Sequence, residues 1–146
     1  MQRHLAKLAA ASLTPILLTG CFSNGYQPNA DPMQLAVYAG KANYPYEVHS
    51  EFAPHLFATV APDATITLYN AGDEPLTDFE LWVNKLYTLH VDKLDSRSSK
   101  AIDPKFIYNS KAENLVNAPA NTLTTIQIYL PVAGKLLDVQ GPIIPH

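Results

Sequence analysis

Histidine and acidic residues gather in one short stretch, and their types are those that bind a metal ion. Glu47, His49 and Glu51 occur at every second position, and His55 follows. On a β-strand the two-residue period places the first three on one face, where imidazole and carboxylate groups bind zinc or a similar ion. A metal site needs three or four converging ligands, and here only the spacing points to one. The favoured interpretation is a solvated edge without a metal, and His90 is likewise expected on a strand surface.

Three aromatic residues form a second candidate site. Tyr69, Trp82 and Tyr129 lie in the strand phase opposite to the expected core residues. On a flat sheet face, such rings could stack on sugar rings or contact a protein. They could instead cover a second sheet or pair across strands. This structural role is favoured, because aromatic residues are common in strands for packing reasons.

Sequence motifs of catalysis are absent. The chain has no nucleophile elbow, no pair of histidines four residues apart beside a glutamate, and no glycine-rich phosphate loop. With only six glycines, phosphate binding by backbone amides is not expected. A catalytic triad assembled through space is left open. The sequence therefore favours a protein that is not an enzyme and that has no cofactor.

The first 21 residues have the order of an export signal. Arg3 and Lys7 precede an apolar segment at 8–18, and Leu18-Thr19-Gly20-Cys21 ends it. The segment is too short for a spanning helix, which needs about 20 apolar residues. The stretch resembles the signal and lipobox of bacterial lipoproteins. The resemblance implies cleavage after Gly20, a diacylglycerol on the Cys21 thiol, and fatty acylation of the new amino group.

The chain is expected to have three parts. Residues 1–20 are the signal peptide, 21–32 are the lipidated cysteine and a flexible tether rich in turn formers, and 33–146 are a single domain. The mature chain has enough residues for one core. Phe22 follows the cysteine where an Asp tends to retain lipoproteins in the inner membrane. The resemblance therefore favours the outer membrane of a bacterial envelope.

Short alternating runs dominate the rest of the sequence. Residues 65–69, 79–83 and 87–91 alternate strictly, and Asn84-Lys85 between the last two predicts a hairpin turn. Residues 33–38 fit a short strand slightly better than a helical turn. The pattern predicts an all-β fold, an immunoglobulin- or fibronectin type III-like sandwich of about seven strands. The expected core comprises Ile66, Leu68, Phe79, Leu81, Val83, Tyr87, Leu89, Val91, Ile102, Phe106, Ile126, Ile128, Leu130, Leu137 and Val139.

The formal charge of the mature chain and its expected location in the envelope limit the functions that the sequence supports. Without Arg3 and Lys7, 8 basic and 13 acidic residues remain, so the mature formal charge is −5. An acidic domain without a basic stripe is not expected to bind nucleic acid. The leading hypothesis is a lipid-anchored, non-enzymatic interaction module that binds another envelope protein as an accessory or assembly subunit. The alternatives are a glycan- or peptidoglycan-binding module using Trp82 and tyrosines, and a metal-binding or hydrolytic protein using His49, Glu51 and His55.

Overall fold

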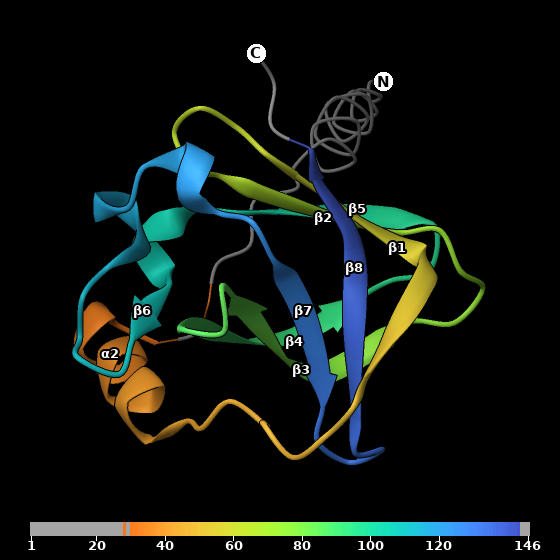
Figure 1. Cartoon of the computed structure of the whole chain (residues 1–146), viewed down its shortest axis with the longest axis horizontal. Helices are drawn as coiled ribbons and strands as arrows, with labels where there is room; N and C mark the ends of the chain where they lie inside the picture. The colour runs from red at the N-terminus through yellow and green to blue at the C-terminus, as the bar shows by residue number, and fades with distance from the viewer. Residues whose placement is uncertain (1–27, 29, 144–146) are drawn as a thin grey trace, which may run out of the picture.

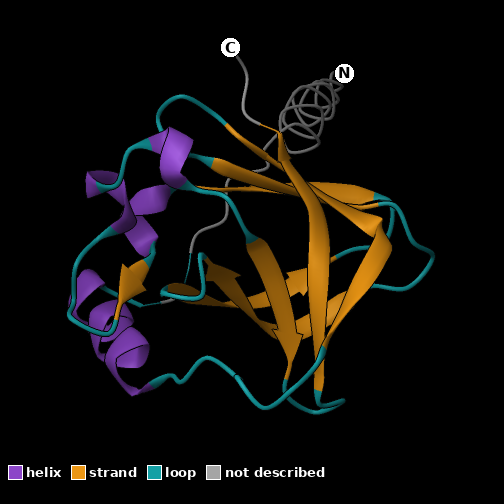
Figure 2. Cartoon of the chain, in the orientation of Figure 1, coloured by secondary structure: helices purple, strands orange, loops and turns teal. Residues whose placement is uncertain are grey.

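The computed structural model describes residues 28 and 30–143, and the strands in it confirm an all-β fold (Figures 1 and 2). Cys21 and the lipobox lie outside the described residues. The strands are β1 (Ser50–Val60), β2 (Ile66–Asn70), β3 (Leu76–Val83), β4 (Tyr87–Leu94), β5 (Ser98–Ile102), β6 (Tyr108–Asn109), β7 (Ile126–Leu130) and β8 (Lys135–Ile143). One α-helix, α2 (Pro32–Lys41), precedes them, and η1 (Pro104–Phe106), η2 (Leu115–Asn117) and η3 (Ala120–Thr122) are short 3-10 turns.

The strands form one hydrogen-bonded sheet in the order β5-β2-β1-β8-β7-β3-β4-β6. The sheet is mixed, because β1 runs parallel to β8 and all other neighbours are antiparallel. It curls, so that β2 and β5 lie on one side of the molecule and β3 and β4 on the other (Figure 1). Two separate sheets are therefore not seen among the described strands, and the immunoglobulin-like topology stays a prediction.

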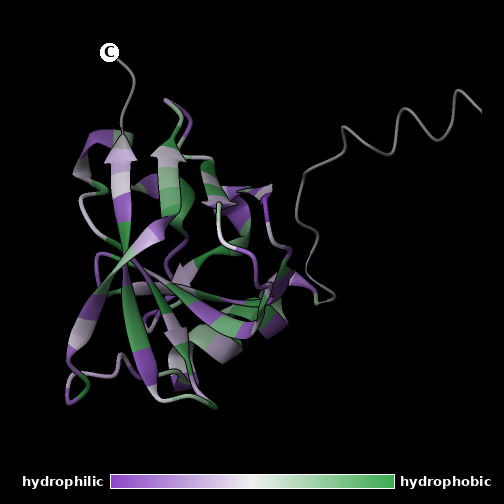
Figure 3. Ribbon diagram, turned by 90° about the vertical axis from the view of Figure 1, so that its right-hand side faces the viewer, coloured by the Kyte–Doolittle hydropathy of each residue, from purple (hydrophilic) through white to green (hydrophobic). Residues whose placement is uncertain are grey.

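The core fills the inside of the curled sheet. Hydrophobic and hydrophilic residues alternate along the strands (Figure 3), as expected when one face is buried and the other is not. Eleven of the fifteen predicted core residues are buried, and Tyr87, Phe106, Leu130 and Leu137 are partly buried at its margin. Sequence reasoning missed Leu35, Leu56, Leu94, Ile107, Leu115 and Leu123, which are also buried there.

The expected strand at 33–38 is wrong, because these residues belong to α2. Asp31 caps the helix: its side chain accepts the backbone N–H of Gln34, whose side chain in turn accepts the backbone N–H of Asp31. This reciprocal pair is a capping box, and Pro32 at the first helical position adds a further start signal. Leu35 and Ala39 are buried, so the side of the helix on which they lie packs against the rest of the domain. No helix among the described residues is long and apolar enough to span a membrane.

Strand β1 is long and irregular. Its pairing with β8 shifts between Ala53 and Phe57, which marks a bulge. Before the bulge Ala53 is buried, and after it Leu56 is buried, so the two-residue alternation is broken. Residues that would share a face of a regular strand therefore lie on opposite faces here.

Short turns dominate the chain between β5 and β7. Phe106 ends the 3-10 turn η1, and β6 contains two residues, Tyr108 and Asn109. The region that follows contains η2 and η3. Leu115 of η2 and Leu123, the residue that follows η3, are buried in the core and hold this region against the sheet.

Candidate functional site

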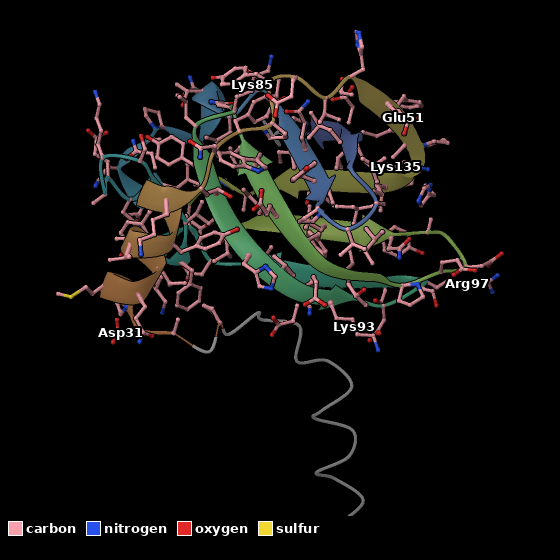
Figure 4. The ribbon with its side chains drawn as sticks, turned by 90° about the horizontal axis from the view of Figure 1, so that it is seen from below. Asp31, Glu51, Lys85, Lys93, Arg97 and Lys135 are labelled. Carbon is pink, nitrogen blue, oxygen red and sulfur yellow. The ribbon has the colours of Figure 1, made fainter. Side chains whose placement is uncertain are left out.

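The outer surface of β3, β7 and β8 is covered by other parts of the chain. The segment 42–49, which joins α2 to β1, crosses it (Figures 1 and 4). Pro45 in this segment is buried, and the Tyr44 hydroxyl donates a 2.6 Å hydrogen bond to Oε1 of Gln127 on β7. The Gln127 side chain then donates to Asp138 on β8 at 2.7 Å. This face of the sheet is therefore largely an internal surface.

Trp82 is part of that internal surface. It is 3% exposed, and its ring meets the Tyr44 ring edge-on, with centroids 5.5 Å apart. Its Nε1 donates a 3.0 Å hydrogen bond to Glu80. Tyr129 is partly buried on β7 opposite Glu80, whereas Tyr69 is 41% exposed on β2. The structure thus does not gather the three predicted aromatic residues on one exposed face, since β1 and β8 separate β2 from β7.

An exposed aromatic patch lies instead on the outer face of β1 and β2. We define it as Phe57 and Tyr69, which are 37% and 41% exposed; Phe52, which is 63% exposed, lies on β1 before the bulge. Phe57 and Tyr69 pair directly across the two strands, and their ring centroids are 6.3 Å apart. Threonines Thr59 and Thr67 continue the same face along the strands. Sequence reasoning found Tyr69 but missed Phe57, because the bulge in β1 interrupts the alternation before it.

The metal candidates His49, Glu51 and His55 do not converge. All three are exposed, and Glu47 lies in a turn before β1 begins. The bulge places His55 out of phase with Glu51, and the His55 carbonyl accepts the N–H of Ala71 at 2.8 Å. Within the described part of the chain, none of the three belongs to a set of three ligand atoms close enough to hold an ion.

One set of potential metal ligands does converge, at the β3–β4 hairpin. Ligand atoms of Asp78, His90 and Asp92 all lie within 4.8 Å of one another, and we call these residues the acid–histidine cluster. His90 Nε2 is 3.3 Å from Asp92 Oδ1 and 3.7 Å from Asp78 Oδ1. The hairpin register could have predicted their proximity, because Asp78 and Asp92 lie between the pairs Thr77–Lys93 and Phe79–Val91, next to the pair Glu80–His90.

The cluster borders a second polar group and a cavity. The Tyr38 hydroxyl of α2 donates a 3.2 Å hydrogen bond to Glu80, and its ring lies edge-on to the His90 ring at 6.3 Å. Burial raises the pKa of Tyr38 well above its ordinary value, and the Glu80 carboxylate raises it further. A cavity of about 250 Å³ lies beside them and is lined by Pro28, Ala30, Gln34, Leu35, Tyr38, His90 and Asp92.

The comparisons with known proteins gave no relative. No family model, no curated protein and no solved structure matches this chain.

Proposed function

We propose that this protein is a lipid-anchored, non-enzymatic interaction module of a bacterial envelope, tethered to the outer membrane through Cys21. Its folded domain presents the aromatic patch to another envelope protein and acts as an accessory or assembly subunit. The observation that carries the proposal is the exposed pair of rings of Phe57 and Tyr69. The resemblance of residues 1–21 to a lipoprotein signal supports the location at the outer membrane.

The chemistry of the patch fits a protein partner. Aromatic residues are enriched at the centres of protein interfaces, where burial of a ring contributes most of the affinity. Phe57 has no polar group with which to orient a sugar, and threonine hydroxyls at Thr59 and Thr67 supply a polar rim. Next to them β5, an edge strand, pairs only with β2 among the described strands.

The position of the patch suits an anchored domain. Pro28, seven residues after Cys21, lines the cavity beside β4, so the chain leaves the domain on that side. Seven residues span at most about 25 Å. The patch lies on β1 and β2, and β2 and β4 are on opposite sides of the curled sheet (Figure 1). A domain held close to the membrane on its β4 side turns the patch toward the aqueous compartment.

The anchor and the patch are tested separately. For the anchor, the mass of the N-terminal peptide from native membranes should show an acylated Cys21, and Cys21→Ser should release the protein from the membrane fraction. An unmodified Cys21, or membrane retention of Cys21→Ser, would contradict the anchor.

For the patch, we compare wild type with the double variant Phe57→Ser/Tyr69→Ser after crosslinking and purification in mild detergent. Val132→Ser is the matched control, because Val132 is 99% exposed on the β7–β8 turn, away from the patch. One envelope protein should co-purify with wild type and with the control. The double variant should recover it about tenfold less or worse, as expected when aromatic anchors are removed. Equal recovery by the double variant would refute the patch. Muropeptides or polysaccharide in place of a protein would favour the glycan-binding alternative.

A further inference from the structure

We propose that the acid–histidine cluster of Asp78, His90 and Asp92 binds a divalent transition-metal cation such as Zn²⁺. One imidazole and two carboxylates are a ligand set that such cations accept. Their ligand atoms already lie within 4.8 Å of one another, so one ion can reach all three. The site is separate from the aromatic patch, and the inference does not depend on the proposed function.

The arrangement of the two carboxylates itself favours a cation. Asp78 and Asp92 lie between the ladder pairs Thr77–Lys93 and Phe79–Val91, at a point where Asp78 has a φ of 48°, and their carboxylates are close enough for like charges to repel. His90, two residues before Asp92 on β4, has its Nε2 within 3.7 Å of Asp78 Oδ1 and 3.3 Å of Asp92 Oδ1. Glu80 adds a third carboxylate at the facing position of His90, although Tyr38 and Trp82 donate hydrogen bonds to it. A divalent ion between Asp78 and Asp92 would replace this repulsion by attraction.

The surroundings leave room for a further ligand on the ion. The three residues provide three protein ligands, which is the number found at zinc sites that keep one position open. His90 and Asp92 also line the cavity of about 250 Å³ against α2, while Asp78 approaches from β3. A water molecule or a small anionic group in the cavity would complete the coordination. The two carboxylates are 73% and 71% exposed, so an ion can enter from solvent.

The hairpin holds the cluster in place without help from flexible loops. All three residues lie within β3 or β4, whose pairing extends from Leu76 and Leu94 to Val83 and Tyr87. Buried neighbours Phe79 and Val91 fix the phase of the two strands, which directs the cluster to the outer face. Ligands on paired strands are positioned more precisely than ligands on loops. The site should therefore bind the ion with little rearrangement.

The test is a titration of the full-length protein in detergent, stripped of metal with a chelator. Calorimetry with Zn²⁺ and the visible spectrum with Co²⁺ should show one bound ion per chain. His90→Gln and Asp92→Asn should each weaken binding by about tenfold or more, since even outer-shell partners of metal ligands contribute that much. His55→Gln is the matched control, because His55 is an exposed strand histidine outside the cluster, and it should bind like wild type.

A second measurement needs no variant. Substoichiometric Co²⁺ or Mn²⁺ should broaden the ring NMR signals of His90 and leave those of His49 and His55 sharp. The proposal is overturned if wild type shows no bound ion at about 1 mM metal, a concentration at which a site with a Kd of about 1 mM is half filled. It is also overturned if His90→Gln binds as wild type does, if His55→Gln loses binding equally, or if all histidine rings broaden alike.

Discussion

Replacing Trp82 with alanine should destabilise the domain strongly, because the indole is an internal packing element. Trp82 is 3% exposed, and its ring meets the Tyr44 ring edge-on. A buried aromatic side chain removes about 150–250 Å² from water. At about 25 cal/mol per Å² this area corresponds to about 4–6 kcal/mol. A compact denatured state reduces the figure, and we expect a loss of about 4 kcal/mol in the free energy of unfolding, in line with tryptophan truncations elsewhere.

The assay is urea unfolding followed by far-ultraviolet circular dichroism, because Trp82 is the only tryptophan and its removal abolishes the fluorescence probe. Tyr69→Ala is the control: its ring is 41% exposed, so we expect a loss of about 1 kcal/mol or less. Trp82→Phe removes the indole N–H together with part of the buried ring. It leaves Glu80 without that hydrogen bond, and should cost about 1–3 kcal/mol. A decrease of less than about 1 kcal/mol in the free energy of unfolding for Trp82→Ala would contradict the claim that Trp82 lies on a covered face. Trp82 would then again be a candidate for stacking on a ligand.

Three further predictions concern single residues. The raised pKa of Tyr38 means that the folded state favours the neutral phenol. This contribution to the free energy of unfolding is complete below pH 10 and is lost as the pH rises toward the folded-state pKa. The urea midpoint of wild type should therefore fall more steeply above pH 10 than that of Tyr38→Phe. Asn84 has a φ of 54°, and its side chain accepts hydrogen bonds from the backbone N–H groups of Thr124 and Thr125. Asn84→Ala should lower the free energy of unfolding by about 2 kcal/mol. An unchanged thermal midpoint would contradict the role assigned to these bonds. Asn70 is fully buried, and its side chain donates a 2.8 Å hydrogen bond to the Glu74 carbonyl. Asn70→Ala should lower the free energy of unfolding, measured with denaturant, by about 1–3 kcal/mol. A decrease no larger than that of a variant at an exposed position would show that water replaces the bond.

The hairpin of β3 and β4 could be predicted from the sequence because its signals are local. Strict alternation over residues 79–83 and 87–91 identifies both strands, and Asn84 and Lys85 adopt the positive φ values of 54° and 61° that a tight hairpin turn requires. The same register leaves Asp78 and Asp92 at matching positions between the pairs Thr77–Lys93 and Phe79–Val91. The acid–histidine cluster could therefore have been predicted from the sequence, although Asp78 lies 12 positions before His90 and 14 before Asp92.

Helix α2 was missed because its pattern is short. It has ten residues and only two of them, Leu35 and Ala39, are buried, so no long helical period appears. The informative signal was at its start, where Asp31, Pro32 and Gln34 form a capping box with proline at the first position. Alternation in the sequence 33–38 pointed to a strand, and tertiary packing of one helical side overrode it.

The exposed sites could not be predicted because they depend on long-range packing. Alternation places Trp82 and Tyr129 on the outer face, but only the fold reveals that segment 42–49 crosses that face. In the same way, the bulge in β1 moves His55 out of phase with Glu51 and brings Phe57 beside Tyr69. A one-residue change of register exchanges the two faces of a strand, and the sequence carries no clear mark of it.

The most direct test of the proposed function is site-specific photocrosslinking in intact native cells. A photoreactive amino acid at position 57 probes the aromatic patch, and the same amino acid at position 132 probes an equally apolar but distant exposed site. We predict one discrete adduct with another envelope protein from position 57, none from position 132, and loss of the adduct when Cys21→Ser removes the anchor. No adduct from position 57, or the same adducts from both positions, would contradict an interaction module that binds through this patch.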